Sequence, residues 1–327
     1  MRVSPDRTAE HGGPMLIAGE VHTGLLRGPD PVTSDQARHL VDLVVGEPVL
    51  VSERPIAYVR SPEIPVGVDC GLGAAGPARQ VRGVGTALQR AAITGGHVVQ
   101  GSAYASIVRG AGGARQPWSH YLTRPGVIET LGRTRWDETA AALAAPERPG
   151  AALDLGAMAG RAADRVQRAV AARGAVRLRS PRTRLRWVAR VEEEAEPGAT
   201  RVGFSVGGGD LRVLRLTVPG VAAAELAAVC EDVAMHDWLL SALLEIIGKS
   251  AIGTIPRQQA LERLLPAIDY LLHLWMPGAR GDELTADVWE VLERRPGFSR
   301  QWDTLVHRIR DQLSVGAVAA LAAAGNR

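Results

Sequence analysis

The chain has 327 residues, of which 46% are hydrophobic and 22% are charged, the balance of an ordinary globular protein. No apolar run approaches the ~18–20 residues that a membrane-spanning helix needs, and residues 1–14 lack the apolar core of a secretory signal, so we expect a cytoplasmic protein without membrane spans. The formal net charge of +3 is too small to imply a nucleic-acid partner by itself.

The N-terminal part of the chain favours β-structure. Residues 1–14 are polar and aperiodic, and we interpret them as a flexible tail. Strand-like runs are expected at 15–26 and at 47–59, the second broken at Pro55. Gly95 and Gly96 can adopt the positive φ angles of a tight turn, so they predict a hairpin between the strands on either side.

Helices dominate the later part of the chain. Ala-rich helices are expected near 137–145 and 153–173, followed by strands within 175–191 and 200–220 and a turn at residues 207–210. After residue 220 the whole pattern is helical, at 221–248, 257–275, 283–294 and 299–323.

This order predicts an α+β fold, with a β-rich N-terminal part containing hairpins and an all-helical C-terminal part. We divide the chain into the tail at 1–14, a β-rich α+β domain at 15–218 and a helical domain at 219–327 packed on it. Cys70 and Cys230 lie far apart in unlike contexts, which argues against a disulfide framework and favours buried thiols.

The segment CEDVAMHDWLL, residues 230–240, places four ionisable side chains in an otherwise apolar helix. At about 100° per residue, His236 and Asp237 fall on the core-facing stripe of this helix and Asp232 flanks it. Two residues point the other way and are expected at the surface: Glu231 and Trp238.

Two interpretations of this segment stay open, because a buried unpaired charge costs on the order of several kcal/mol and must have a partner. In the structural interpretation, Asp232 bonds His236, and Asp237 meets a backbone group or an arginine of the β-rich part. In the functional interpretation, Asp232, His236 and Asp237 form an acid/base or metal-dependent catalytic site at the seam of the two domains.

A second aspartate and histidine four residues apart, Asp269 and His273, lie in the expected helix at 257–275 and face away from its apolar stripe. They predict a surface ion pair rather than a shared metal site. The pattern assigns neither metal ligands nor a cofactor.

An arginine-rich strand is expected between residues 176 and 190, which contain no acidic residue. Guanidinium groups at alternate positions suit phosphates or carboxylates. The predicted anion-binding residues are Arg177, Arg179, Arg182, Arg184 and Arg186, with Arg190 continuing the row. The alternative is a solvated hairpin face balanced by the acidic run at 192–196.

Two weaker patterns complete the candidates. Glu20 and His22 share one face of an expected strand and could join Asp69 in a polar pocket. Ser119 and His120 are neighbours in sequence, but no acid partner is indicated for a nucleophile and base pair.

Several strings resemble a family of conserved hypothetical proteins of filamentous actinobacteria: GEVHTGLL, SERPIAYVRSP, GVDC, PWSHYLTRPGV, CEDVAMHDWLL, DYLLHLWMP and RPGFSRQW. The resemblance spans residues 16 to 313. It implies a gene neighbourhood with a methyltransferase-like protein and a variant P-loop protein, and so implies other proteins of that neighbourhood as partners, but no activity.

The sequence supports three hypotheses for function. The first is a non-catalytic interaction or scaffold component of a multi-protein system. The second is an enzyme with its site around His236 at the domain seam. The third is an anionic ligand or nucleic acid bound by residues 177–190, with nucleic acid the less favoured ligand.

Overall fold

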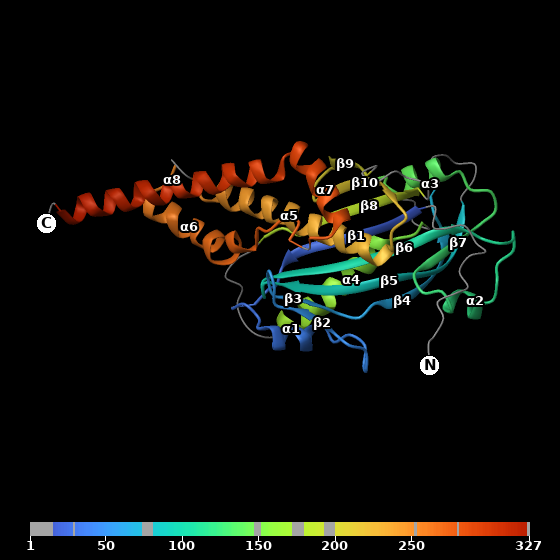
Figure 1. Ribbon diagram of the computed structural model, residues 1–327. Helices are drawn as coiled ribbons and strands as arrows, with labels where there is room; N and C mark the ends of the chain where they lie inside the picture. Colours follow the sequence, from blue (N-terminus) through green and yellow to red (C-terminus); the bar gives the residue numbers. More distant parts are fainter. Residues whose placement is uncertain are drawn as a thin grey trace.

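A ten-stranded mixed sheet forms the centre of the computed structural model, and helices pack on both of its faces (Figure 1). The structure describes residues 16–28, 30–73, 81–146, 152–171, 180–192, 200–251, 254–279 and 281–325. The predicted α+β class is confirmed, with strands concentrated early in the chain and helices later. The predicted tail at 1–14 lies outside the described residues.

The strands follow the order β2-β3-β5-β7-β6-β1-β8-β10-β9, and β4 pairs with β5. Only the β6–β7 and β8–β10 pairs are parallel among the named strands. Their bounds are β1 Leu16–Leu25, β2 Leu50–Ser52, β3 Tyr58–Arg60, β4 Ile64–Gly71, β5 Arg82–Thr94, β6 Val98–Arg109, β7 Val127–Leu131, β8 Thr183–Glu192, β9 Arg201–Val206 and β10 Leu211–Pro219.

Every described regular element after β10 is helical, and four helices precede that point. The helices are α1 Ser34–Val41, α2 Trp118–Leu122, α3 Trp136–Leu143, α4 Leu155–Ala171, α5 Ala223–Lys249, α6 Arg257–Tyr270, α7 Glu283–Arg294 and α8 Phe298–Gly325, with a 3₁₀ turn, η1, at Leu272–Leu274. Among the described residues, no helix combines the length and apolar character needed to span a membrane.

The two predicted turns are confirmed. Gly95 and Gly96 have φ angles of 57° and 69° and connect β5 to β6. A Cβ on Gly96 would lie 2.4 Å from the carbonyl oxygen of Val32, so both the backbone conformation and the close approach require glycine here. Residues 207–210 likewise connect β9 to β10.

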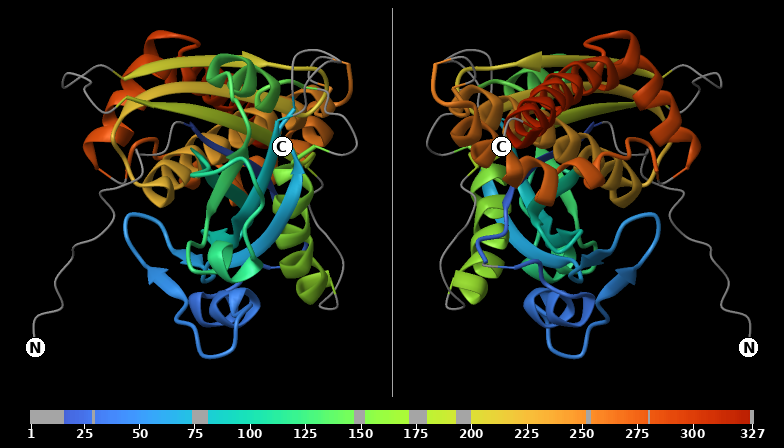
Figure 2. Two further views of the ribbon diagram at one scale, coloured as in Figure 1. Left: turned by 90° about the vertical axis from the view of Figure 1, so that its right-hand side faces the viewer. Right: turned by 90° about the vertical axis from the view of Figure 1, so that its left-hand side faces the viewer.

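Alternation along β1 divides its side chains between the two faces of the sheet. Ile17 and Val21 belong to the apolar core shared with α5, whereas Glu20 and His22 lie against glycines of α4. Figure 2 shows α4 and α5 on opposite faces of the strands. Helix α4 approaches closely because Gly101 of β6 has no side chain, and a Cβ there would lie 2.1 Å from a carbonyl oxygen of the helix.

Helix α5 is the centre of the largest apolar core. The sheet covers one side of it, and α6, α7 and α8 cover the others. Glu231 and Trp238, which we expected at the surface, are therefore buried, with exposed fractions of 1% and 0%. The helical projection placed these two side chains at the surface because it assumes that a helix packs on one side only, whereas α5 is covered by the sheet and by three helices. The same core draws on residues from both sides of the boundary expected at 218, and that boundary stays a prediction.

Candidate functional site

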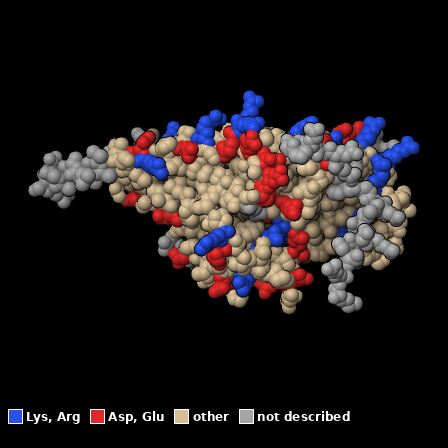
Figure 3. Space-filling model, viewed as in Figure 1, with Lys and Arg blue, Asp and Glu red and all other residues tan. Residues whose placement is uncertain are grey.

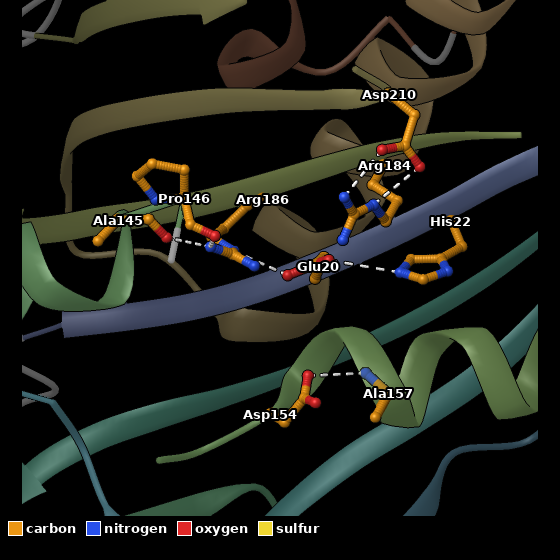
Figure 4. Close-up of polar contacts among 9 residues, drawn as sticks. All are labelled: Glu20, His22, Ala145, Pro146, Asp154, Ala157, Arg184, Arg186 and Asp210. Atoms are coloured by element: carbon orange, nitrogen blue, oxygen red, sulfur yellow. Dashed lines mark hydrogen bonds and ion pairs between the residues drawn. The ribbon is translucent and has the colours of Figure 1, made fainter. Parts of the chain in front are cut away.

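A polar cavity of about 510 Å³ lies between α4 and the strands β1 and β8. Its wall carries side chains from all three elements, and Figure 4 shows how the central ones converge. The ionisable residues that line it are Glu20, His22, Asp154, Arg161, Asp164, Arg182, Arg184 and Arg186. We call it the β1–β8 cavity.

The register of β1 and β8 creates this cluster. Glu20 lies opposite Arg186, and His22 lies opposite Arg184, in adjacent antiparallel strands. Directly opposed residues project to the same face of a sheet and lie close enough to interact. On the other face of β8, Leu185 and Trp187 enter the apolar core against α5, which confirms the predicted alternation of this strand.

Arg186 and Glu20 form a buried ion pair at the base of the cavity. Arg186 Nε donates to Glu20 Oε2 at 2.8 Å, and the two side chains are 5% and 1% exposed. Arg186 Nη1 also donates to the carbonyl oxygens of Ala145 and Pro146 (Figure 4). The guanidinium group is thus fixed from two sides before any ligand arrives.

Two glycines of α4 make room for the β1 side chains. A Cβ on Gly156 would lie 2.5 Å from Glu20 Oε1, and one on Gly160 would lie 3.2 Å from His22 Nδ1. His22 Nε2 lies 3.4 Å from Glu20 Oε1, and the His22 side chain keeps 13% of its surface exposed. A carboxylate next to one ring nitrogen orients the imidazole and leaves the other nitrogen for a different partner.

The other two arginines of this segment, Arg184 and Arg182, form ion pairs with carboxylates. Arg184 makes two hydrogen bonds to Asp210, of 2.9 Å from Nε and 2.8 Å from Nη2 (Figure 4). These bonds lower the pKa of the Asp210 carboxyl despite its partial burial. Arg182 Nη1 lies 2.7 Å from Asp164 Oδ1 on α4. In the described part of the chain, Arg161 of α4 makes no ion pair.

The partners of the arginine row differ from those we expected. Arg182, Arg184 and Arg186 pair with Asp164, Asp210 and Glu20, and Arg190 pairs with Asp137 of α3, whereas only Glu192 of the acidic run at 192–196 is among the described residues. Residues 193–196 and the predicted anion-binding residues Arg177 and Arg179 lie outside the described residues.

The predicted catalytic residues Asp232 and His236 lie on the opposite face of the sheet, inside the helical core. His236 is 0% exposed, its Nδ1 lies 2.8 Å from the backbone oxygen of Asp232, and its Nε2 lies 3.3 Å from the backbone nitrogen of Met276. Burial lowers the pKa of His236, although Asp232 opposes this effect. A neutral ring with both nitrogens bonded to backbone is the arrangement of a structural histidine.

Asp237 meets an arginine of the β-rich part, as the structural interpretation expected. Its carboxylate lies 3.3 Å from Arg212 Nε of β10, and it does not line the β1–β8 cavity. Burial raises the pKa of Asp237, against the opposing effect of Arg212.

The remaining candidates lie elsewhere. Asp69 of β4 pairs with Arg82 and Arg115, so it does not join Glu20 and His22 in a pocket. Asp269 and His273 are exposed, and no ion pair joins them. His120 does have an acid partner that the sequence did not reveal, Glu129, whose Oε1 lies 2.8 Å from His120 Nε2.

Within the described residues, no three His, Cys, Asp or Glu side chains are grouped closely enough to hold a metal ion. The two cysteines are free thiols, with Cys230 buried and Cys70 partly buried.

Comparisons with protein-family models, with curated proteins and with solved structures find no match. The site must therefore be interpreted from its own geometry.

Proposed function

We propose that the protein binds a small anionic molecule, with a phosphate or carboxylate group, in the β1–β8 cavity. One observation carries this proposal: Arg182, Arg184 and Arg186 of one chain segment line a single cavity, and each is held by an acid. Guanidinium groups fixed in this way lose little conformational entropy when a ligand binds, and their planar donors match phosphate and carboxylate oxygens.

Donors remain after these internal bonds. Asp210 occupies Nε and Nη2 of Arg184, while Nη1 has no hydrogen bond to another described residue. Arg161, exposed on α4, adds a guanidinium without an ion pair in the described chain. These two residues are the expected contacts of the anionic group.

The carboxylates of the lining restrict the ligand further. Four arginines line the cavity with three carboxylates, those of Glu20, Asp154 and Asp164. Asp154 is committed to the first turn of α4, where its Oδ1 accepts from the Ala157 backbone nitrogen at 2.8 Å (Figure 4). A mixed lining of this kind favours a ligand that also carries hydroxyl or amino groups, rather than a bare polyanion.

Nucleic acid is disfavoured by the surface charge. Figure 3 shows acidic and basic side chains interspersed over the face in view, without a continuous basic area there. A phosphate backbone requires an extended basic track rather than an arginine-lined cavity with internal acid partners.

The test is calorimetric titration at low ionic strength with inorganic phosphate, with glucose 6-phosphate, which adds hydroxyl groups, and with phosphoserine, which adds an amino group. We expect Arg184→Gln and Arg161→Ala each to weaken binding by about tenfold or more, and added salt to weaken it further. Arg190→Gln is the matched control, because Arg190 lies on the same strand face but pairs with Asp137 outside the cavity. The proposal fails if none of the three anions binds, or if the control loses as much affinity as the cavity variants.

Enzymatic action is a second candidate function, and it is favoured by the position of His22. A partly exposed imidazole backed by Glu20 faces the same cavity as the arginines, which is suitable for proton transfer to or from a bound anion. If so, the acid/base residue is His22 rather than His236. His22→Gln should then abolish turnover of a ligand found by titration while changing its affinity by only a few fold.

Docking to other proteins, which the resemblance stated above implies, stays a further proposal. Helices α5, α6 and α8 extend together beyond the sheet at the left of Figure 1, and in Figure 3 the middle of that region is uncharged, with acidic and basic side chains along its edges. Leu244, Leu265 and Val315 of these helices are 52%, 47% and 46% exposed. Loss of capture of a candidate partner protein by Leu265→Glu, but not by Val45→Glu at a different exposed position, would support it.

A further inference from the structure

A second cavity, of about 360 Å³, lies where the β2–β3 hairpin meets α5 and the segment after η1. We call it the hairpin cavity. Its size is within the ~300–1,000 Å³ range of small-molecule sites. It shares no lining residue with the β1–β8 cavity, so a ligand bound here would be independent of the proposed function.

Asp232 supplies a carboxylate to the wall of this cavity without a cationic partner. Trp289 Nε1 and the Gly278 backbone nitrogen both donate to its Oδ2, at 2.7 and 3.4 Å. His236 Nδ1 is 3.6 Å from Oδ1 and bonds the Asp232 backbone oxygen instead. No arginine or lysine of the described chain pairs with this carboxylate, which is only 8% exposed.

Arg54 and Arg60 supply charge of the opposite sign to the same cavity. Neither forms an ion pair with a described residue, and neither reaches Asp232. A buried carboxylate and nearby guanidinium groups normally gain free energy by pairing. Here the cavity separates them, so a ligand with both charges could satisfy both sides at once.

Apolar side chains form much of the rest of the lining. Ile56 of the hairpin, Met235 of α5 and Met276 after η1 line the cavity, and Met276 is 41% exposed. Methionine side chains adapt to apolar groups of different shapes. The cavity therefore combines an acceptor for an ammonium group, donors for a carboxylate and an adaptable apolar wall.

We propose that the hairpin cavity binds a free α-amino acid with an apolar side chain. Its ammonium group would contact Asp232, its carboxylate Arg54 or Arg60, and its side chain the two methionines. This arrangement would give Asp232 the arginine-like or lysine-like cationic partner that the described residues do not provide.

The first experiment is calorimetric titration of the full chain with L-phenylalanine, L-leucine and L-methionine. It is followed by 2-phenylethylamine, which lacks the carboxylate, and 3-phenylpropionate, which lacks the ammonium group. We expect at least one amino acid to bind, and each truncated analogue of phenylalanine to bind about tenfold or more weakly. Absence of binding by all three amino acids would overturn the proposal, and so would equal binding of the analogues.

Variants then locate the site. Asp232→Asn should reduce the affinity for the amino acid and for 2-phenylethylamine, but not for 3-phenylpropionate. Asp237→Asn is the control, because Asp237 lies on the same helix and pairs with Arg212 outside the cavity. Asp232 also accepts a bond from Trp289, so Asp232→Asn can change the stability of the protein as well as its affinity. Met276→Trp is therefore a second variant, in which a larger side chain at a partly exposed position fills the cavity. If the amino acid binds Met276→Trp with unchanged affinity, the proposed site is wrong.

Discussion

Arg90 of β5 and Glu231 of α5 form a bidentate ion pair in which each side chain is only 1% exposed. The two bonds, of 2.7 and 3.0 Å, join the sheet to the helix that we expected to present Glu231 to solvent. Glu63 adds a third bond, to Arg90 Nη1 at 2.8 Å, and accepts from the hydroxyl of Tyr104. Burial opposes the charge on Arg90, but Glu231 raises its pKa, so the guanidinium stays ionised.

The first prediction concerns this pair. Glu231→Ala should lower the free energy of unfolding by ~3–5 kcal/mol, because it leaves a buried guanidinium without its main counter-charge. Urea unfolding followed by far-UV circular dichroism measures the change. Glu290→Ala breaks an exposed pair with Arg294 and should cost less than ~1 kcal/mol. If the two variants lost the same free energy of unfolding, the stabilising role of the buried Arg90–Glu231 pair would be contradicted.

The second prediction concerns the contact between α4 and β1. Gly156→Ala should lower the free energy of unfolding by ~1–3 kcal/mol and weaken anion binding, because its methyl group would displace Glu20 from Arg186. Gly248→Ala is the matched control in another helix, where a Cβ meets nothing within 4 Å. It should be neutral or stabilise by up to ~1 kcal/mol. Thermal melting of both variants distinguishes local crowding from a general effect of alanine.

The third prediction concerns pH. Burial, with a smaller effect of His273, lowers the pKa of His97 to about 4, and burial also lowers that of His236. The unfolded chain takes up these protons near pH 6.5, and the folded chain only at lower pH. Stability should therefore be complete above pH 6.5 and decrease as the pH falls from 6.5 toward 4.

Urea midpoints at several pH values between 7.5 and 4.5 test this dependence. His97→Gln should reduce the pH dependence of the urea midpoint, whereas His39→Gln, at an exposed position of α1, should leave this dependence unchanged. A midpoint that rises on acidification through this range would show that the sign is wrong.

The fourth prediction separates structural from catalytic roles for His236. His236→Ala removes a ring that lies edge-on to Trp275 and Trp289 and bonds two backbone groups. We expect a loss of ~2–5 kcal/mol of stability from the cavity and the unpaired amide. Ligand affinity at the β1–β8 cavity should not change, since that cavity is on the other face of the sheet. A stable variant without a midpoint shift would return His236 to the candidates for catalysis.

Local sequence patterns predicted much of the fold. The glycine pair at 95 and 96, the alternation along β8 and the long periodic helices depend on neighbours within a few residues, so one sequence suffices to recognise them. Helix α1 was missed, although Thr33 and Gln36 form a complete capping box that the sequence spells as T-x-x-Q.

The candidate site was harder to predict, because it depends on strand register. Glu20 and Arg186 were both noticed, in separate patterns, yet 166 positions separate them in the chain. Only the β1–β8 pairing places them opposite each other, and nothing local to either strand specifies that pairing. The same limit applies to Glu231, because its partner Arg90 lies on β5, 141 positions earlier in the chain.

The position of α5 has a consequence for how the chain can be divided. Trp187, Leu214 and Leu216 of the sheet pack in the core that α5 fills. A shortened protein that ended at residue 218 would expose this apolar surface along the length of the sheet, and we expect it to aggregate rather than fold. We therefore expect the strands and the C-terminal helices to fold together, so that proteolytic cleavage near residue 219 would leave neither part folded.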